Sequence, residues 1–213
     1  MKESTYSILE KLILRYPDLE AVKNDIEKTY SILEETYKNN GKVLVCGNGG
    51  SAADCEHIVG ELMKGFLLPR KLTEKEVRDF SEYENGEYVA NGLQKGLPAV
   101  SLVSQSGLMT AFLNDCSPDL VFAQQVYTYM NPCDTLIALS TSGNSANVLN
   151  AVITARAKGG KCVALTGEKE SRISTISDCT IKLPSDKTYV IQEYTLPVYH
   201  CICAMLEEEF FGE

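Results

Sequence analysis

The two histidines of this chain each have a polar partner at helical spacing. His57 and Glu61 are four residues apart and Gln192 and His200 are eight apart, so each pair can share one face of a helix. Two imidazoles, a carboxylate and an amide oxygen can hold Zn²⁺ or a similar divalent ion if the two helices meet. Glu61 and His200 can instead transfer protons as base and acid. Pro197 can kink the second helix, which leaves the convergence of Gln192 and His200 open.

Each pair also has a plainer interpretation. Taken alone, His57 and Glu61 are more often an exposed pair on a helix surface. The apolar residues of their helix lie on its other side, so we expect both side chains to point away from the sheet, toward solvent or another subunit. Residues 194–206 carry no charged side chain, so we expect the imidazole of His200 to be a buried, hydrogen-bonded core group.

Two polar loops have the composition of a phosphate site. Residues 134–147 read DTLIALSTSGNSAN, an apolar strand followed by a loop with four hydroxyl groups and then a helix. The amides and positive dipole end of a helix, with hydroxyl donors, suit a phosphomonoester dianion, although such a loop about equally often only caps its helix. Gly143 permits the turn, and Ser145 occupies the N-cap position. The loop GNGGS at 47–51 follows another apolar strand, and parallel strands end at one edge of a sheet, where ligands bind.

Dinucleotide binding is the obvious rival interpretation of the first loop. Gly47, Gly49 and Ala52 formally match the pattern GxGxxG/A. The match is weak, because the following helix leads into a charged segment rather than into a strand that ends with an acidic residue. No GxxxxGK[ST] motif occurs to hold a triphosphate, so a small phosphorylated ligand fits better.

The elements that must position these loops alternate along the chain. Apolar runs predict strands at 42–46, 99–103, 135–139, 162–165 and 179–183, with helices at 51–66, up to 113, at 145–158 and after Gly167. A helical arm at 1–40, divided by Pro17, precedes them, and a helix at about 190–211 follows. This alternation predicts an α/β fold, a doubly wound parallel five-stranded sheet in one domain, 1–213. The charged segment 69–98 is expected to be an inserted helical or mobile flap, with or without a role in gating.

Composition excludes several classes of partner. Acidic residues number 29 against 20 basic ones, a formal net charge of −9, which argues against nucleic acid or an anionic membrane as the main partner. No apolar run reaches the length that spans a bilayer, and the first residues lack a secretory pattern. The eight cysteines show no CxxC spacing. We therefore expect a cytoplasmic protein with reduced, buried thiols.

These motifs together resemble the SIS (sugar isomerase) phosphosugar-binding domains, and among them the sedoheptulose 7-phosphate isomerases, or phosphoheptose isomerases. The resemblance covers nearly the whole chain. STSGNS alone indicates only the wider superfamily, whereas HxxxE together with QxxxxxxxH narrows it considerably. The matching segments are VLVCGNGGSAADCEHIVGEL at 43–62, LND at 113–115, LSTSGNSANV at 139–148, VALTG at 163–167 and IQEYTLPVYH at 191–200.

The resemblance implies aldose–ketose isomerisation through an enediol, most simply of sedoheptulose 7-phosphate to D-glycero-D-manno-heptose 7-phosphate. Glu61 would take the proton from the carbon beside the carbonyl, and His200 would serve the oxygens as acid. The family's zinc positions correspond to His57, Glu61, Gln192 and His200, and its members are homotetramers with sites between subunits. One carboxylate cannot be a firm metal ligand and a free base at once, so these two roles of Glu61 are coupled alternatives. The implied substrate and phosphate contacts are Asn48, Gly49, Gly50, Ser51, Glu61, Asn114, Asp115, Ser140, Thr141, Ser142, Ser145 and Gln192.

The sequence departs from the family pattern in three places. The insertion at 69–98 is longer than the usual link, a family arginine has no clear counterpart beyond Lys64 or Arg70, and Tyr189 replaces a usually polar residue. Proteins of this fold also include non-catalytic adaptors that bind the bacterial replication initiator, and phosphosugar-sensing regulators. The adaptors lack the full carboxylate and histidine set, and the regulators usually carry a DNA-binding module for which this chain has no room. The sequence therefore favours an enzyme.

Overall fold

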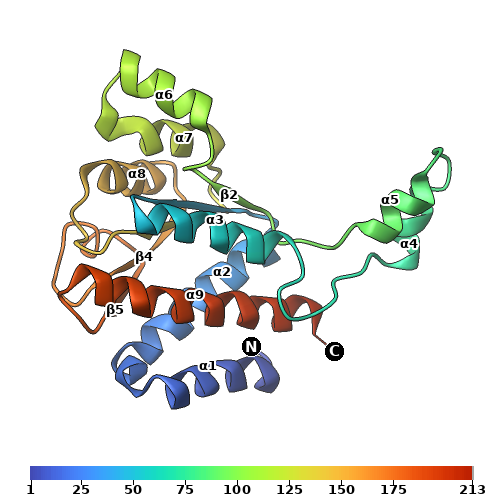
Figure 1. The fold of residues 1–213 in the computed structure, drawn as a ribbon, viewed down its shortest axis with the longest axis horizontal. Helices are drawn as coiled ribbons and strands as arrows, with labels where there is room; N and C mark the ends of the chain where they lie inside the picture. The colour runs from blue at the N-terminus through green and yellow to red at the C-terminus, as the bar shows by residue number, and fades with distance from the viewer. Residues whose placement is uncertain (213) are drawn as a thin grey trace.

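A parallel β-sheet lies at the centre of the structure, a computed structural model that describes residues 1–212 (Figure 1). Its strands are β1 (Val43–Gly47), β2 (Ala99–Ser101), β3 (Thr135–Leu139), β4 (Lys161–Gly167) and β5 (Cys179–Leu183). They are arranged in the order β2-β1-β3-β4-β5, and every neighbouring pair is parallel. The predicted α/β fold with a five-stranded parallel sheet is confirmed.

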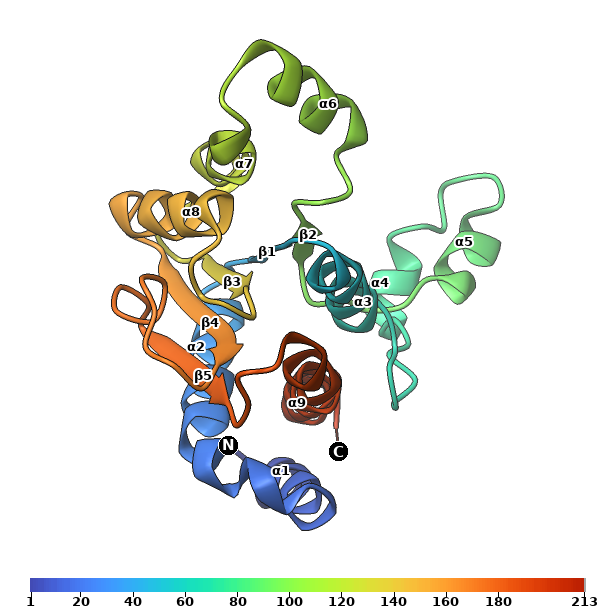
Figure 2. The ribbon, with the colours of Figure 1, turned by 60° about the vertical axis from the view of Figure 1, so that its left-hand side comes forward.

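Helices cover both faces of this sheet, as Figures 1 and 2 show. All residues of β1 and β3 are buried, which is typical of parallel strands covered on two sides. Successive side chains of a strand point to opposite faces. Val43 and Val45 accordingly join a core formed with α2 (Lys23–Lys38), α3 (Gly50–Met63) and α9 (Thr188–Phe211).

The second core lies on the opposite face of the sheet. Leu44 and Cys46 of β1 enter it together with Leu136 and Ala138 of β3. Its helices are α7 (Val121–Tyr129) and α8 (Ala146–Ala157), which pack against each other. The sheet therefore lies between two layers of helices. The loops that follow its strands all leave from the same edge of the sheet, because the strands are parallel.

The N-terminal arm is helical, as predicted, and it breaks at Pro17. It consists of α1 (Glu3–Arg15), the 3₁₀ helix η1 (Pro17–Val22) and α2. Helix α1 packs against α9, and Glu209 of α9 accepts hydrogen bonds from the Lys2 amide at 2.9 Å and the Thr5 hydroxyl at 3.0 Å. The two ends of the described chain are thus held together.

Two segments project from this body, as both ribbon views show. The insertion contains α4 (Glu74–Arg78) and α5 (Gly86–Gly92), and a bridge between Lys71 and Gln94 closes its base. Thr73 and Glu76 form a capping box at the start of α4. The other segment is α6 (Ser106–Asp115) with the 3₁₀ helix η2 (Pro118–Leu120), and no residue of α6 is buried. The insertion, expected to be a helical or mobile flap, therefore contains two short helices.

The prediction of a helix after Gly167 was wrong. Residues 168–178 form turns between β4 and β5. Ser171 and Ser174 each accept a hydrogen bond from the backbone amide of the other, at 2.9 and 3.2 Å, so their hydroxyls compete with helical bonding. Helix α7 was not predicted, although Pro118 begins the 3₁₀ turn that leads into it.

Candidate active site and metal centre

The two polar loops begin side by side at one edge of the sheet. Gly47, the last residue of β1, pairs in register with Leu139, the last residue of β3. Asn48 and Asn147 then link the loops through two reciprocal amide hydrogen bonds of 2.9 Å each. The expectation that both loops face one place is therefore met.

The serine-rich loop turns tightly before α8. The Gly143 amide bonds to the Ser140 carbonyl at 2.9 Å, and Gly143 has a φ of 63°, which glycine adopts without strain. Ser145 occupies the N-cap position of α8, but its hydroxyl contacts the Ser140 hydroxyl at 3.2 Å and makes no capping bond. Ser145 is thus an N-cap by position only, which leaves its hydroxyl beside the helix N-terminus for a ligand.

The GNGGS loop leads directly into α3. Gly49, with a φ of 58°, is the N-cap of α3, and Ser51 is buried in its first turn. An open pocket of about 360 Å³ lies beside this loop, with Met109 of α6 on its far wall. Asn114 and Asp115 lie at the other end of α6, where both are exposed and bonded to each other at 2.8 Å.

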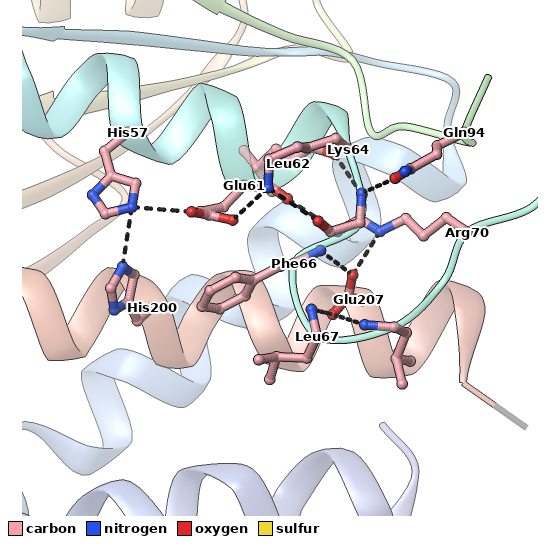
Figure 3. A network of polar contacts seen from close by, with 12 residues as sticks. His57, Glu61, Leu62, Lys64, Phe66, Leu67, Arg70, Gln94, His200 and Glu207 are labelled. Carbon is pink, nitrogen blue, oxygen red and sulfur yellow. Dashed lines mark hydrogen bonds and ion pairs between the residues drawn. The ribbon is translucent and has the colours of Figure 1, made fainter. Parts of the chain in front are cut away.

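Helices α3 and α9 bring three of the predicted metal residues together (Figure 3). The His57 Nε2 atom lies 3.0 Å from Glu61 Oε1 and 3.4 Å from His200 Nε2. One ligand atom from each residue lies within 4.8 Å of the others, so this cluster can hold a metal ion. Two imidazoles and one carboxylate supply three ligands, and tetrahedral zinc sites with Zn–N bonds near 2 Å have ligand–ligand distances of roughly 3.3 Å. The donor set and its spacing fit a divalent metal.

The surroundings of the two histidines differ from the sequence expectation. His57 is exposed but points toward α9 of its own chain, and His200 is half-buried rather than enclosed in the core. Burial and the neighbouring His57 lower the pKa of His200, and Glu61 acts in the opposite direction. A neutral imidazole at neutral pH can both donate and accept a hydrogen bond.

Gln192 lies at the opposite end of the site from this cluster. A Cβ atom at Gly50 would come within 2.6 Å of the Gln192 Nε2 atom, so the amide packs against the start of α3. Gly50 precedes His57 by seven residues, a rise of about 10 Å along a helix. Helix α9 continues through Pro197. Within one chain, Gln192 therefore lies by the GNGGS loop, and its place among the metal ligands stays a prediction.

A buried ion pair fixes the end of α3 to α9 (Figure 3). The Arg70 guanidinium donates to Glu207 at 2.8 Å and to the carbonyls of Leu62 at 2.6 Å and Glu61 at 3.0 Å. The Glu207 carboxylate also accepts the backbone amides of residues 66, 67 and 68 at 2.6–3.1 Å. Arg70 is thus buried beneath the site, whereas Lys64 lies 3.4 Å from Glu61 Oε2 and is the basic group beside this carboxylate.

Sequence reasoning missed Tyr199 and Asp54. The Tyr199 hydroxyl lies 2.8 Å from His57 Nδ1 and 3.4 Å from Asp54 Oδ1. No local pattern identifies this contact, because it joins α9 to α3. Asp54 lies three residues before His57 on the same helix, and this spacing is the one sequence signal that could have placed Asp54 near the site.

Comparisons with known proteins identify the family of this chain. Two models of the SIS domain match, at residues 99–205 and 14–90. The phosphoheptose isomerase of Helicobacter pylori is 36% identical over 192 residues, covering 90% of this chain and 88% of that protein. The phosphoheptose isomerase of Aliarcobacter butzleri is 36% identical over 191 residues, with the same coverage.

Solved structures give the same result. A phosphoheptose isomerase from Francisella tularensis superimposes with a TM-score of 0.75 at 28% identity, covering 98% of this chain and all of the other. Phosphoheptose isomerase GmhA from Neisseria gonorrhoeae gives a TM-score of 0.72 at 29% identity, covering 96% and 98%. The chain belongs to the phosphoheptose isomerase family of SIS-domain enzymes. Within residues 1–212, no helix is both long and apolar enough to cross a membrane.

Proposed function

We propose that this enzyme interconverts sedoheptulose 7-phosphate and D-glycero-D-manno-heptose 7-phosphate. The observation that carries the proposal is a carboxylate and an imidazole on the helix that begins at the GNGGS loop, with a second imidazole beside them on α9. His57 and Glu61 stand on α3, and the GNGGS loop and Gln192 lie at its start. One ligand can therefore reach both ends of the site.

The length of the site supports a long sugar. Gly50 and His57 are separated by about 10 Å of helix. An extended seven-carbon chain with a terminal phosphate also spans on the order of 10 Å, given carbon–carbon bonds of about 1.5 Å. With its phosphate at the serine-rich loop, such a sugar would present its first two carbons to the histidine cluster.

The residues would divide the chemistry between them. Ser51, Ser140, Thr141, Ser142 and Ser145 would bind the phosphate through hydroxyls and helix amides. Glu61 would remove the proton from the carbon beside the carbonyl and return it to the neighbouring carbon, while His200 moves a proton between the two oxygens. The remaining substrate contacts in the proposal are Asn48, Gly49, Gly50, Asn114, Asp115 and Gln192.

Zinc is the proposed metal, held by His57, Glu61 and His200, with Gln192 as the fourth predicted ligand. A divalent ion held by these residues would supply Lewis-acid chemistry toward the sugar oxygens. Because a metal-bound Glu61 is a poor base, metal binding and proton transfer at this carboxylate are coupled. Lys64, 3.4 Å from Glu61 Oε2, would orient this carboxylate.

The quaternary structure and location are also part of the proposal. An oligomer of four copies with sites between subunits would cover α6, none of whose residues is buried. It would also bring Asn114 and Asp115 of one copy near the site of another. A cytoplasmic location agrees with eight free cysteines, of which Cys116 and Cys133 are exposed and the other six buried.

The direct test incubates the purified protein with sedoheptulose 7-phosphate and follows the aldose product by NMR. Parallel samples contain added zinc or a chelator, and a third measures phosphosugar binding by calorimetry. Conversion supports the reaction and the substrate, and a loss with chelator supports a working metal. Binding without conversion in every sample would contradict the proposal and favour a non-catalytic phosphosugar-binding adaptor. The His–Glu–His cluster argues against that alternative, because an adaptor needs no acid, base or metal ligand.

A further inference from the structure

The imidazole of His57 is contacted at both of its nitrogen atoms. Nε2 faces Glu61 and His200, and Nδ1 lies 2.8 Å from the hydroxyl of Tyr199. Tyr199 directly precedes His200 on α9, and Tyr199 is buried. Its hydroxyl also lies 3.4 Å from Asp54 Oδ1, one turn before His57 on α3. Asp54, Tyr199 and His57 thus form a continuous polar chain that ends in the cluster.

The chemistry of the Tyr199 hydroxyl matters because it can both donate and accept a hydrogen bond. A neutral imidazole carries one proton, on either Nδ1 or Nε2. When Nε2 binds a metal, the proton must be on Nδ1, and that N–H needs an acceptor to fix the ring. Tyr199 is the group placed to be that acceptor, and Asp54 is placed to accept a hydrogen bond from the Tyr199 hydroxyl.

We propose that Tyr199 is a positioning residue for the metal centre, and that Asp54 sets the direction of the Tyr199 hydroxyl. The inference rests on the proposed metal site. Without metal, His57 Nε2–H donates to Glu61 and the Tyr199 hydroxyl donates to Nδ1. With metal, the Nε2 lone pair points into the cluster, Nδ1–H donates to the Tyr199 oxygen, and the hydroxyl donates to Asp54.

This exchange conserves protons and charge within the group. The imidazole is neutral in both arrangements, and one proton passes from Nε2 to Nδ1. The Tyr199 O–H bond is kept, and only its direction changes, from His57 toward Asp54. Tyrosine can serve both arrangements, whereas phenylalanine can serve neither. Replacing Tyr199 by phenylalanine retains the ring that packs edge-on against both imidazoles, at centroid distances of 5.5 and 4.9 Å.

The test uses the full chain with histidine labelled with ¹⁵N. Because the chain has two histidines, only four ring nitrogens appear, and His200→Asn assigns them. Metal-free protein is titrated with zinc, with NMR reporting the tautomer of His57 and calorimetry reporting the zinc affinity. In the wild type we expect zinc to convert His57 to the form protonated at Nδ1. In Tyr199→Phe we expect zinc affinity to fall about 10- to 100-fold, the usual effect of losing an outer-shell partner.

A matched control removes a different hydroxyl from the same helix. Tyr194 donates to Asp18 at 2.7 Å on the exposed side of α9, so Tyr194→Phe should keep the wild-type zinc affinity. Asp54→Ala tests the second link and should weaken zinc binding less than Tyr199→Phe. Circular dichroism on each variant establishes that it is folded.

The possible outcomes separate this inference from the proposed metal site. Equal zinc affinity in Tyr199→Phe and the wild type, with both folded, would overturn the role of Tyr199 and leave the metal site standing. A zinc complex in which His57 binds through Nδ1 would do the same. A wild type that binds no zinc would overturn both.

Discussion

At the scale of single residues, Glu61 has the most demanding surroundings. Its carboxylate lies 3.0 Å from His57 Nε2 and 3.4 Å from Lys64 Nζ, and its own carbonyl accepts a bond from Arg70. The carboxylate oxygens are thus held in place by the side chains of neighbouring residues on α3 and just beyond its end, and the Glu61 backbone is held by Arg70. The carboxylate that a base would use is also the one that lies with His57 and His200 in the possible metal cluster, so the two roles compete for the same oxygen atoms.

Replacing Glu61 by glutamine should therefore remove the base while preserving size. We expect kcat for isomerisation to fall about 10² to 10⁴-fold, the usual contribution of one general base, with phosphosugar affinity little changed. His200→Asn should lower kcat in the same range. Product formation by NMR and binding by calorimetry measure the two quantities. Glu20→Gln, in the exposed part of η1, is the control, and full activity in Glu61→Gln would exclude its role as base.

Gly143 offers a separate test of the phosphate loop. Its φ of 63° disfavours any side chain, and an added Cβ would lie 2.0 Å from the Ser171 hydroxyl. Strain of this kind is on the order of 1–3 kcal/mol, so Gly143→Ala should displace the loop and raise KM by about 10-fold or more, with a smaller effect on kcat. Gly92→Ala is the matched control, because no atom lies within 4 Å of its added Cβ. An unchanged KM in Gly143→Ala would separate this loop from the substrate.

At the scale of secondary structure elements, the site depends on how α3 and α9 are held together. Gly50 meets Gln192 at one level, and His57 meets His200 two turns later, so the two helices run parallel. Beyond the cluster, Arg70 and Glu207 join the end of α3 to α9. This pair fixes the relative position of the two helices close to Glu61.

Removing one member of this buried pair should destabilise the protein strongly. Arg70→Met leaves the Glu207 charge buried, and we expect the free energy of unfolding to fall by about 3–5 kcal/mol. Urea denaturation followed by circular dichroism measures the change. Lys169→Met is the control, because its pair with Asp186 is exposed and should contribute at most about 1 kcal/mol. Similar losses in both variants would contradict the proposed difference between buried and exposed pairs.

At the scale of the whole molecule, the chain exposes apolar side chains in two places. Helix α6 has no buried residue, and Leu108 and Leu113 on it are more than 40% exposed. A groove of about 390 Å³ between α1 and α9 also opens beside His200, with Leu196 and Pro197 in its wall. Apolar surface of this kind is typical of an interface.

Light scattering on the eluted protein should therefore give a mass near four times the 23.5 kDa chain. Placing charges on α6 with Leu108→Asp and Leu113→Asp should lower that mass and reduce activity, because burying unpaired carboxylates in an interface is unfavourable. Leu14→Asp, on the exposed side of α1, is the control and should keep the wild-type mass. A wild type that elutes as a monomer would rule out the tetramer.

The sequence by itself determined the sheet, both loops and the two residue pairs. These are local features: apolar runs of strand length, glycine turns, hydroxyl-rich helix starts and i,i+4 spacing depend on neighbouring residues, so they can be identified along one segment. Strands β3 and β5 agree with their predicted bounds, and His57, Glu61 and His200 meet as the pattern suggested. The single domain, the gating role of 69–98 and the ligand role of Gln192 stay predictions.

Only the tertiary structure decided the contacts that join distant segments. Tyr199 reaches His57 and Asp54 across 142 and 145 residues of sequence, and Arg70 finds Glu207 across 137. Burial of His200 and the side-chain position of Gln192 likewise depend on how α9 packs against α3. Such contacts arise when two helices pack together on a sheet. The residue spacing within one helix does not specify which side chains of the other helix it will contact.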